Sequence, residues 1–136
     1  MAVALDADAV IGFLDRSDAL HDSAAHEVGT RVLAAREPLI VSAITFAGVL
    51  TGALLGHREE GPVRGFFAEL VSEVVPVDLE VAEAGARLRS RERLPMPDAL
   101  MLASARLHPE ISALITGDRE IARLPDPGVE IVLLEG

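Results

Sequence analysis

The chain has 136 residues, half of them hydrophobic and a quarter charged, which is typical of a globular protein with one hydrophobic core. It contains no cysteine and no lysine, which excludes disulfides, zinc–thiolate sites, thiol nucleophiles and any mechanism that requires a lysine. The net charge of −10 argues against broad, nonspecific binding to nucleic acid, because such binding requires a basic surface.

The sequence lacks the usual signals for export or membrane insertion. No apolar run approaches the roughly 20 residues that span a bilayer, and the N-terminus has no positively charged segment typical of a signal peptide. No linker rich in proline, glycine or serine divides the chain. We therefore expect a cytoplasmic protein that forms a single domain over residues 1–136 and does not associate with membranes.

Short apolar runs alternate with amphipathic segments along the chain. The runs predict buried strands at residues 3–5, 39–41, 113–115 and 131–134, with a weaker strand at 74–77. The segments between them predict helices at 7–14, 19–35, from 42 or 45 to 55, 63–71, 79–91 and 98–107. Because hairpin signals are absent, the alternation predicts an α/β fold, a three-layer α/β/α sandwich with a central, mainly parallel sheet.

Three acidic residues lie where such a sheet binds its ligands, at the carboxyl ends of the strands. Asp6 ends the first predicted strand, Asp118 follows the strand at 113–115, and Asp98 lies in the first turn of a very apolar helix. Clustered carboxylates raise each other's pKa values, so a cluster of this kind favours a bound cation. Mg²⁺ or Mn²⁺ suits such oxygen ligands.

Helix capping is the alternative for each of these three acids, because aspartate commonly accepts hydrogen bonds from the free N–H groups at a helix start. The remaining aspartates lack the strand-end context, and we expect them to be solvated or capping residues. They are Asp8, Asp15, Asp18, Asp22, Asp78 and Asp126.

Four segments in order carry a resemblance to a known family: LDADAVIGFLD, VSAITFAGVLTG, LPMPDALMLASA and ITGDREI. Together they resemble the PIN-domain ribonucleases, in particular the VapC-type toxins of type II toxin–antitoxin pairs. The resemblance covers essentially the whole chain. It implies a compact α/β/α sandwich, often a homodimer, that cleaves RNA with Mg²⁺ or Mn²⁺ and is silenced by a small cognate antitoxin protein.

The resemblance also assigns residues. Asp6, Asp98 and Asp118 match acids that bind the metal and act in catalysis, and Thr116 matches a hydroxyl often found beside the site. Thr116 is therefore expected to contact the RNA substrate, and Arg119, which lies beside Asp118 in the sequence, is placed to contact it as well. In the implied mechanism, a divalent ion held by Asp6 and Asp98 polarises a phosphate oxygen and lowers the pKa of the water that attacks phosphorus.

One acid of the family pattern is missing. The family places a glutamate three residues after a threonine that matches Thr45, and this chain has Gly48 there. Glycine in a helix interior costs about 1 kcal/mol relative to alanine, so it is not an obvious structural choice. The sequence leaves three explanations open: natural loss of activity, deliberate inactivation, or replacement by another acid such as Glu59, Glu60 or Glu69.

Two rival functions remain open on the sequence alone. The segment from Asp6 to Val10 also resembles the nucleophile motif of haloacid-dehalogenase-like phosphatases, although those enzymes normally need a lysine, which this chain lacks. A catalytically inactive PIN module that binds antitoxin or RNA is the second alternative, and Gly48 favours it.

Two weaker signals concern surfaces. Arginines alternate at positions 87, 89, 91 and 93, which spreads them around a helix and favours a solvated face over phosphate contact. The apolar stretch at 49–55 and the Phe66–Phe67 pair suggest a homodimer interface or a groove for an antitoxin helix.

Overall fold

The computed structural model describes all 136 residues and forms a five-stranded parallel sheet. The strands are β1 (Ala2–Leu5), β2 (Ile40–Ser42), β3 (Glu73–Val75), β4 (Ile111–Thr116) and β5 (Glu130–Leu133). Strand β4 pairs with both β1 and β5, and β2 pairs with β3, all in parallel. A parallel bridge between Val3 and Leu39 joins the two groups, so the strand order is β3-β2-β1-β4-β5. The predicted α/β class with a central parallel sheet is confirmed.

Helices connect the strands, and six of them follow the predicted segments closely. They are α1 (Ala7–Leu14), α2 (His21–Val28), α3 (Ala43–Leu54), α4 (Glu60–Glu69), α5 (Leu79–Glu92) and α6 (Met96–Leu107). The predicted helix at 19–35 starts later, and it continues after α2 as the π-helix η1 (Gly29–Ala34). The sequence did not predict α7 (Arg119–Ala122), because four residues are too few to show a helical period. None of these helices is long and apolar enough to cross a bilayer.

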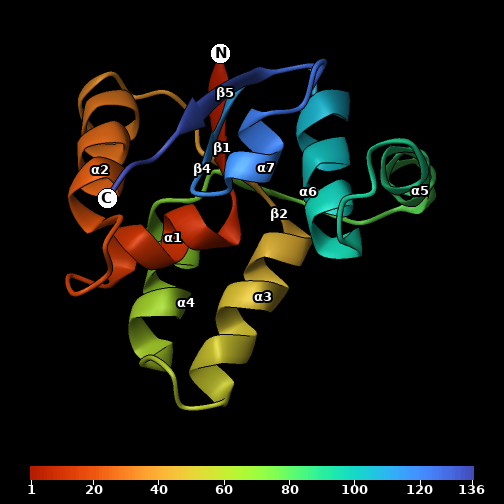
Figure 1. Cartoon of the computed structure of the whole chain (residues 1–136). Coiled ribbons are helices and arrows are strands. Elements are labelled where there is room, and N and C mark those ends of the chain that lie inside the picture. The colour runs from red at the N-terminus through yellow and green to blue at the C-terminus, as the bar shows by residue number, and fades with distance from the viewer.

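Alternation along the strands divides the core into two layers. Val3 and Leu5 of β1 point into a core formed with α1, α2, α3 and α4. Ala2 and Ala4 point to the opposite face, into a core formed mainly with α5, α6 and α7. Figure 1 shows α1, α2 and α4 on one side of the strands and α5 and α6 on the other. This is the expected three-layer arrangement, since successive side chains of a strand point to opposite faces.

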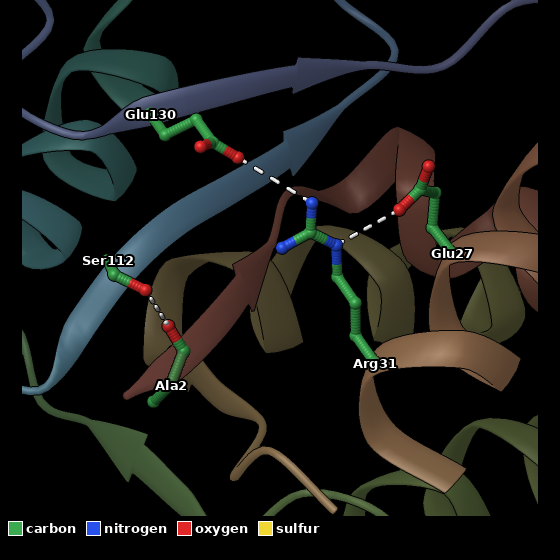
Figure 2. Close-up of polar contacts among 5 residues, drawn as sticks. All are labelled: Ala2, Glu27, Arg31, Ser112 and Glu130. Carbon is green, nitrogen blue, oxygen red and sulfur yellow. Dashed lines mark hydrogen bonds and ion pairs between the residues drawn. The ribbon is translucent and has the colours of Figure 1, made fainter. Parts of the chain in front are cut away.

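Polar contacts tie the edge strand β5 to the helical layer. Figure 2 shows the guanidinium of Arg31, in η1, between Glu27 of α2 and Glu130 of β5. The Arg31–Glu27 distance is 3.0 Å and the Arg31–Glu130 distance is 3.6 Å. Nearby, the Ser112 hydroxyl of β4 donates to the Ala2 carbonyl of β1 at 3.3 Å. These contacts lie away from the carboxyl ends of the strands and serve the fold.

Candidate active site at the carboxyl ends of β1 and β4

The strand order places a topological switch point between β1 and β4. From β1 the chain proceeds outward to β2 and β3 on one side, whereas β4 and β5 lie on the other side. Asp6 directly follows β1, Thr116 ends β4 and Ser42 ends β2. In open parallel sheets, ligands bind at this edge beside the switch point. The fold therefore brings residues that are more than a hundred positions apart in the sequence to the expected ligand site.

Asp6 is held by hydrogen bonds to both of its carboxylate oxygens. Its Oδ1 accepts from the backbone N–H of Ala9 at 2.8 Å, which caps α1, and its Oδ2 accepts from the Thr116 hydroxyl. The Thr116 hydroxyl oxygen in turn accepts from the backbone N–H of Asp118 at 2.9 Å. Burial, with smaller contributions from the charges of Asp8 and Asp98, raises the pKa of Asp6 to about 7 despite these hydrogen bonds. Asp6 is 6% exposed.

Asp98 is positioned differently, on the first turn of α6. The residue that precedes this helix is Pro95, which provides no side-chain cap, and the Asp98 carboxylate makes no hydrogen bond within the protein. Partial burial raises its pKa, followed by the charges of Asp118 and Asp8. A carboxylate that neither caps a helix nor pairs with a cation has no structural role of its own here, which leaves it available to a ligand.

Asp118 caps α7, where its Oδ1 accepts from the backbone N–H of Glu120 at 2.8 Å. The capping interpretation is therefore confirmed for Asp6 and Asp118, whereas for Asp98 it is wrong. Capping uses one oxygen of Asp118, so its second oxygen remains free for other interactions.

Asp8 is a member of the acidic group that the sequence analysis missed. Asp8 lies at an exposed position of α1. Its pKa is nevertheless raised, first by partial burial and next by the charge of Asp118. Asp8 also raises the pKa values of Asp6 and Asp98. Asp8 is exposed, as expected for a solvated residue, and it also lies close enough to the other acids for their charges to affect it. Its position two residues after the strand-end Asp6 was a usable signal.

A glycine allows the loop after β4 to approach Asp8 closely. A Cβ atom on Gly117 would lie 3.2 Å from the Asp8 Cβ and 2.5 Å from Leu20 Cδ1. Since any other residue at 117 would displace Leu20 or Asp8, the glycine permits Asp8 and Asp118 to lie near each other across the loop.

A small pocket of about 80 Å³ opens between the starts of α1, α3 and α6. Asp6, Asp98, Thr45 and Gly48 line it together with apolar neighbours. The Thr45 side chain is 3% exposed, and its hydroxyl is the one buried side-chain polar atom of the protein without a hydrogen-bond partner. Buried polar groups are normally paired, so a ligand or water in the pocket could satisfy this hydroxyl.

Gly48 lies at this same pocket, on the exposed side of α3. A Cβ atom there would meet only the Cβ of Ala7, at 3.8 Å, which is an ordinary contact distance. Packing does not require glycine at this position. A longer side chain at 48 would therefore start at the wall of the pocket that contains Asp6 and Asp98.

None of the three glutamates considered as substitutes reaches the pocket. Glu60 pairs with Arg64 at 2.6 Å. Glu59, which directly precedes α4, and Glu69, at the end of α4, line other pockets. The suggestion that one of them replaces the missing acid is wrong. The structure instead offers Asp8 and Asp118 as further acids near Asp98.

The oxygen donors around the pocket are of the type that hard divalent cations prefer. Asp6 and Asp98 could each supply a carboxylate oxygen and Thr45 a hydroxyl oxygen. No three acidic or histidine side chains are arranged to hold one ion by themselves. Mg²⁺ commonly binds through one or two carboxylates and keeps several waters, so the donor set fits an ion of this kind with water as the remaining ligands.

The two residues predicted to bind substrate have different surroundings. Thr116 is completely buried, and its hydroxyl contacts Asp6, so in this structure it positions a carboxylate. Arg119 is exposed at the first residue of α7, directly after Asp118. Its role in RNA binding stays a prediction.

Comparison with known proteins identifies the family. The PIN domain profile matches residues 3–127, and no curated protein sequence matches the chain. A toxin–antitoxin complex from Klebsiella pneumoniae is 29% identical, with 95% of each chain covered and a TM-score of 0.67. The Rickettsia felis VapBC2 complex, bound to promoter DNA, is 15% identical, with 99% of this chain and all of that chain covered and a TM-score of 0.75.

The sarcin–ricin loop cleaving toxin VapC20 from Mycobacterium tuberculosis is 20% identical, with 90% of this chain and 96% of that chain covered and a TM-score of 0.65. These likenesses confirm the resemblance found in the sequence, and they correct the phosphatase alternative, which belongs to another family. The PIN domain match extends from β1 to the loop before β5 and includes Asp6, Asp98 and Asp118. This chain therefore belongs to the PIN domain family.

Proposed function

We propose that this protein is a divalent-metal-dependent endoribonuclease that acts as the toxin of a type II toxin–antitoxin pair. One observation carries the proposal: two carboxylates, Asp6 and Asp98, and the unpaired hydroxyl of Thr45 surround one pocket at the switch point of a PIN-domain sheet. The toxin–antitoxin complex at 29% identity and the sarcin–ricin loop cleaving toxin with the same fold support it.

Asp6 and Asp98 would hold the cation, with Asp118 and Asp8 completing a negative rim. When bound, Mg²⁺ or Mn²⁺ supplies a Lewis acid for the scissile phosphate and lowers the pKa of an attacking water. Thr116 orients Asp6 by donating to its Oδ2, so that the carboxylate faces the pocket in one conformation. Because the pKa of Asp6 is about 7, ion binding at neutral pH competes with a proton on this carboxyl.

Arg119 would contact the RNA backbone beside the cleaved bond. It is exposed, it follows Asp118 directly, and it forms no ion pair with a carboxylate. A guanidinium can form two parallel hydrogen bonds to a phosphate, which suits this role. The positive charge also offsets part of the negative rim that RNA must approach.

Gly48 would reduce the activity without disturbing the fold. The pocket lacks the carboxylate that the family places at this position, and no nearby glutamate replaces it. A weaker hold on the cation and a slower reaction follow from one fewer negative ligand. An inactive PIN module that binds antitoxin or RNA is the second candidate, and this same vacancy favours it.

As a toxin of this kind, the protein would bind a cognate antitoxin and a second copy of its own chain. Leu54 and Leu55 at the end of α3 are 66% and 67% exposed, so this part of the 49–55 stretch is available for association. Phe66 is 3% exposed and packs against Phe13 and Phe67, with ring centroids 5.7 and 5.4 Å apart. Phe66 belongs to the core, which corrects the suggestion that the phenylalanine pair forms an interface.

The test of the activity is cleavage of a labelled structured RNA by the purified chain with Mn²⁺, Mg²⁺ or EDTA. We expect slow cleavage that requires the metal and is abolished by Asp98→Asn. Asp126→Asn is the matched control, because Asp126 is an exposed aspartate in the loop before β5, outside the pocket. Cleavage that persists in EDTA or in Asp98→Asn would contradict the proposal. RNA binding without cleavage would instead support the inactive module.

A further inference from the structure

The pocket that contains Asp6 and Asp98 has two helical walls, which come from distant parts of the chain. Thr45 lies in the α3 wall, and Asp98 and Met101 lie in the α6 wall. A cation held between these walls needs oxygen atoms from both helices, at distances fixed to within about 0.2 Å. The separation of α3 from α6 therefore determines whether the donor oxygens of the two walls can bind one ion.

Two buried serines join the walls where α3 begins. Ser42 ends β2 and is the N-cap of α3, where its hydroxyl accepts from the Ile44 N–H at 3.2 Å. Ser104 lies on α6, and its hydroxyl oxygen is 3.3 Å from that of Ser42. Because Ser42 is 5% exposed and Ser104 is 2% exposed, bulk water does not compete for this contact.

The two hydroxyls form a closed hydrogen-bond network. The Ser104 hydroxyl also donates to the Leu100 carbonyl, one turn earlier in α6, at 2.9 Å. A hydroxyl group has one hydrogen and two lone pairs, so the two serines together satisfy the Leu100 carbonyl, the Ile44 N–H and each other. Hydrogen bonds depend on distance and angle, whereas the apolar packing of Ile44 and Met101 in the same pocket has no directional preference.

The place of Ser104 on α6 connects this contact to the pocket. Met101 and Ser104 are three residues apart and share a face of the helix, and Met101 lines the pocket. Ser104 is six residues after Asp98, which corresponds to about 9 Å along the helix axis. On the other wall, Thr45 follows Ser42 within the first turn of α3. A shift at the serine pair therefore moves Asp98 relative to Thr45.

We propose that Ser104 is a positioning residue, which acts through Ser42 to hold α6 at a fixed separation from α3 so that Asp98 and Thr45 face the same ion. This inference rests on the proposed metal-dependent function and deepens it, since neither serine lines the pocket. A serine that donates to the carbonyl four residues earlier slightly destabilises and bends its helix, and alanine is the better helix former. The contact with Ser42 accounts for a hydroxyl at this position, whereas the stability of α6 does not.

The first test measures the separation of the two helices without metal. Because the chain has no cysteine, spin labels attached at Thr51→Cys and Leu107→Cys report one distance between α3 and α6 by double electron–electron resonance. Both positions are exposed, and dilution with unlabelled protein removes distances between chains. In EDTA, Ser104→Ala should shift the mean distance by on the order of 1–2 Å or widen its distribution. An unchanged distribution would overturn the inference.

The second test measures the Kd for Mn²⁺ of the unlabelled protein in the absence of RNA. Ser104→Ala should raise this Kd about tenfold, the low end of the range found for groups that support metal ligands. In RNA cleavage, the variant should need more Mn²⁺ for half-maximal rate, and its rate should recover at saturating Mn²⁺, because the ion favours the closed arrangement of the walls. A lower maximal rate with an unchanged Kd would show a purely structural role and contradict the proposal.

Ser112→Ala is the matched control. It removes a serine hydroxyl whose hydrogen bond has the same length, 3.3 Å, but joins β4 to β1 at the amino ends of the strands. We expect it to leave the helix separation and the Kd for Mn²⁺ unchanged, and urea unfolding checks that both variants are folded. An equal rise of the Kd in the two variants would show a general loss of stability and overturn the inference.

The outcome is separate from the proposed function. If the unmodified chain binds no Mn²⁺, the ribonuclease proposal fails and the distance measurement in EDTA decides the role of Ser104. Cleavage that depends on Asp98, together with an unaltered distance and Kd in Ser104→Ala, would instead refute the positioning role and retain the ribonuclease.

Discussion

The substitution Gly48→Glu tests how the vacant position affects the candidate site. It introduces a carboxylate at the wall of the pocket that contains Asp6 and Asp98. The structure accommodates the side chain, since its Cβ would meet only the Cβ of Ala7 at 3.8 Å. We expect divalent-metal-dependent RNA cleavage to increase about ten- to a hundredfold, the range by which ligand-supporting groups usually alter metal sites.

In the absence of metal, two opposing effects determine how Gly48→Glu changes the free energy of unfolding. Removing a glycine from the interior of α3 stabilises the helix by up to about 1 kcal/mol. For a separation on the order of 6 Å between carboxylates in one pocket, each ionised neighbour would cost the new carboxylate about 3 kcal/mol at an effective dielectric constant of 20, and less where solvent screens it. Repulsion therefore exceeds the helix gain when both aspartates are ionised. Gly48→Glu should be less stable than the unmodified protein in EDTA at pH 8.

The assay combines urea unfolding with RNA cleavage, each in EDTA and in Mn²⁺. Gly48→Gln is the matched control, because it has the same shape and helix propensity without the charge. A concentration of Mn²⁺ 100 times its Kd should stabilise Gly48→Glu by about 2.7 kcal/mol, with a smaller effect on Gly48→Gln. Equal metal-dependent cleavage and equal metal stabilisation in the two variants would refute the account of Gly48 as a vacant ligand position.

Three further predictions concern the residues that support the site. The pKa of Asp6 is raised from 3.8 to about 7, so the folded state binds this proton more tightly than the unfolded state, and the free energy of unfolding in EDTA should fall as pH rises from about 4 to 8. The fall is on the order of 4 kcal/mol at most, and Asp6→Asn, which keeps the cap, should flatten it in urea titrations across this range. Thr116→Val removes the hydroxyl that donates to Asp6. It should lower the free energy of unfolding by about 1–3 kcal/mol at pH 8 and by less at pH 5, where Asp6 is protonated. The same destabilisation at both pH values would argue against the hydrogen bond as its cause. Gly117→Ala places a Cβ 2.5 Å from Leu20 Cδ1 and 3.2 Å from the Asp8 Cβ. We expect this crowding to destabilise the protein by about 1 kcal/mol and to change the pKa of Asp8, which NMR titration can measure. An unaltered pKa of Asp8 would show that the loop does not position this acid.

The strands and most helices were predictable because their patterns are local. The apolar run at residues 113–115 lies within β4 (Ile111–Thr116), and the segment 7–14 coincides with α1 (Ala7–Leu14). Periods of two and of 3.6 residues can be detected in the sequence wherever an element is long enough and has one buried face. The four-residue α7 does not satisfy that condition and was missed, whereas η1 was predicted only as the continuation of an ordinary helix and not as a π-helix.

The acids of the candidate site were predictable in part, for a related reason. Asp6 and Asp118 follow apolar strands, and the carboxyl ends of parallel strands meet at one edge of a sheet. Asp8 carries the same charge but lies on an exposed helical position, where an aspartate is usually solvated. Only the proximity of Asp118 and Asp98, across the loop at Gly117, distinguishes it from the other surface aspartates.

The fold class, the family resemblance and the vacancy at Gly48 could be established from the sequence, because they depend on residue order and on the alternation of apolar and polar positions. Three other features required the tertiary structure: Thr116 holds Asp6, Thr45 has an unpaired hydroxyl beside Gly48, and Ser104 contacts Ser42. Each of these depends on side chains from distant segments meeting at a particular distance. Such distances are set by the packing of helices on the sheet, which local sequence patterns do not specify.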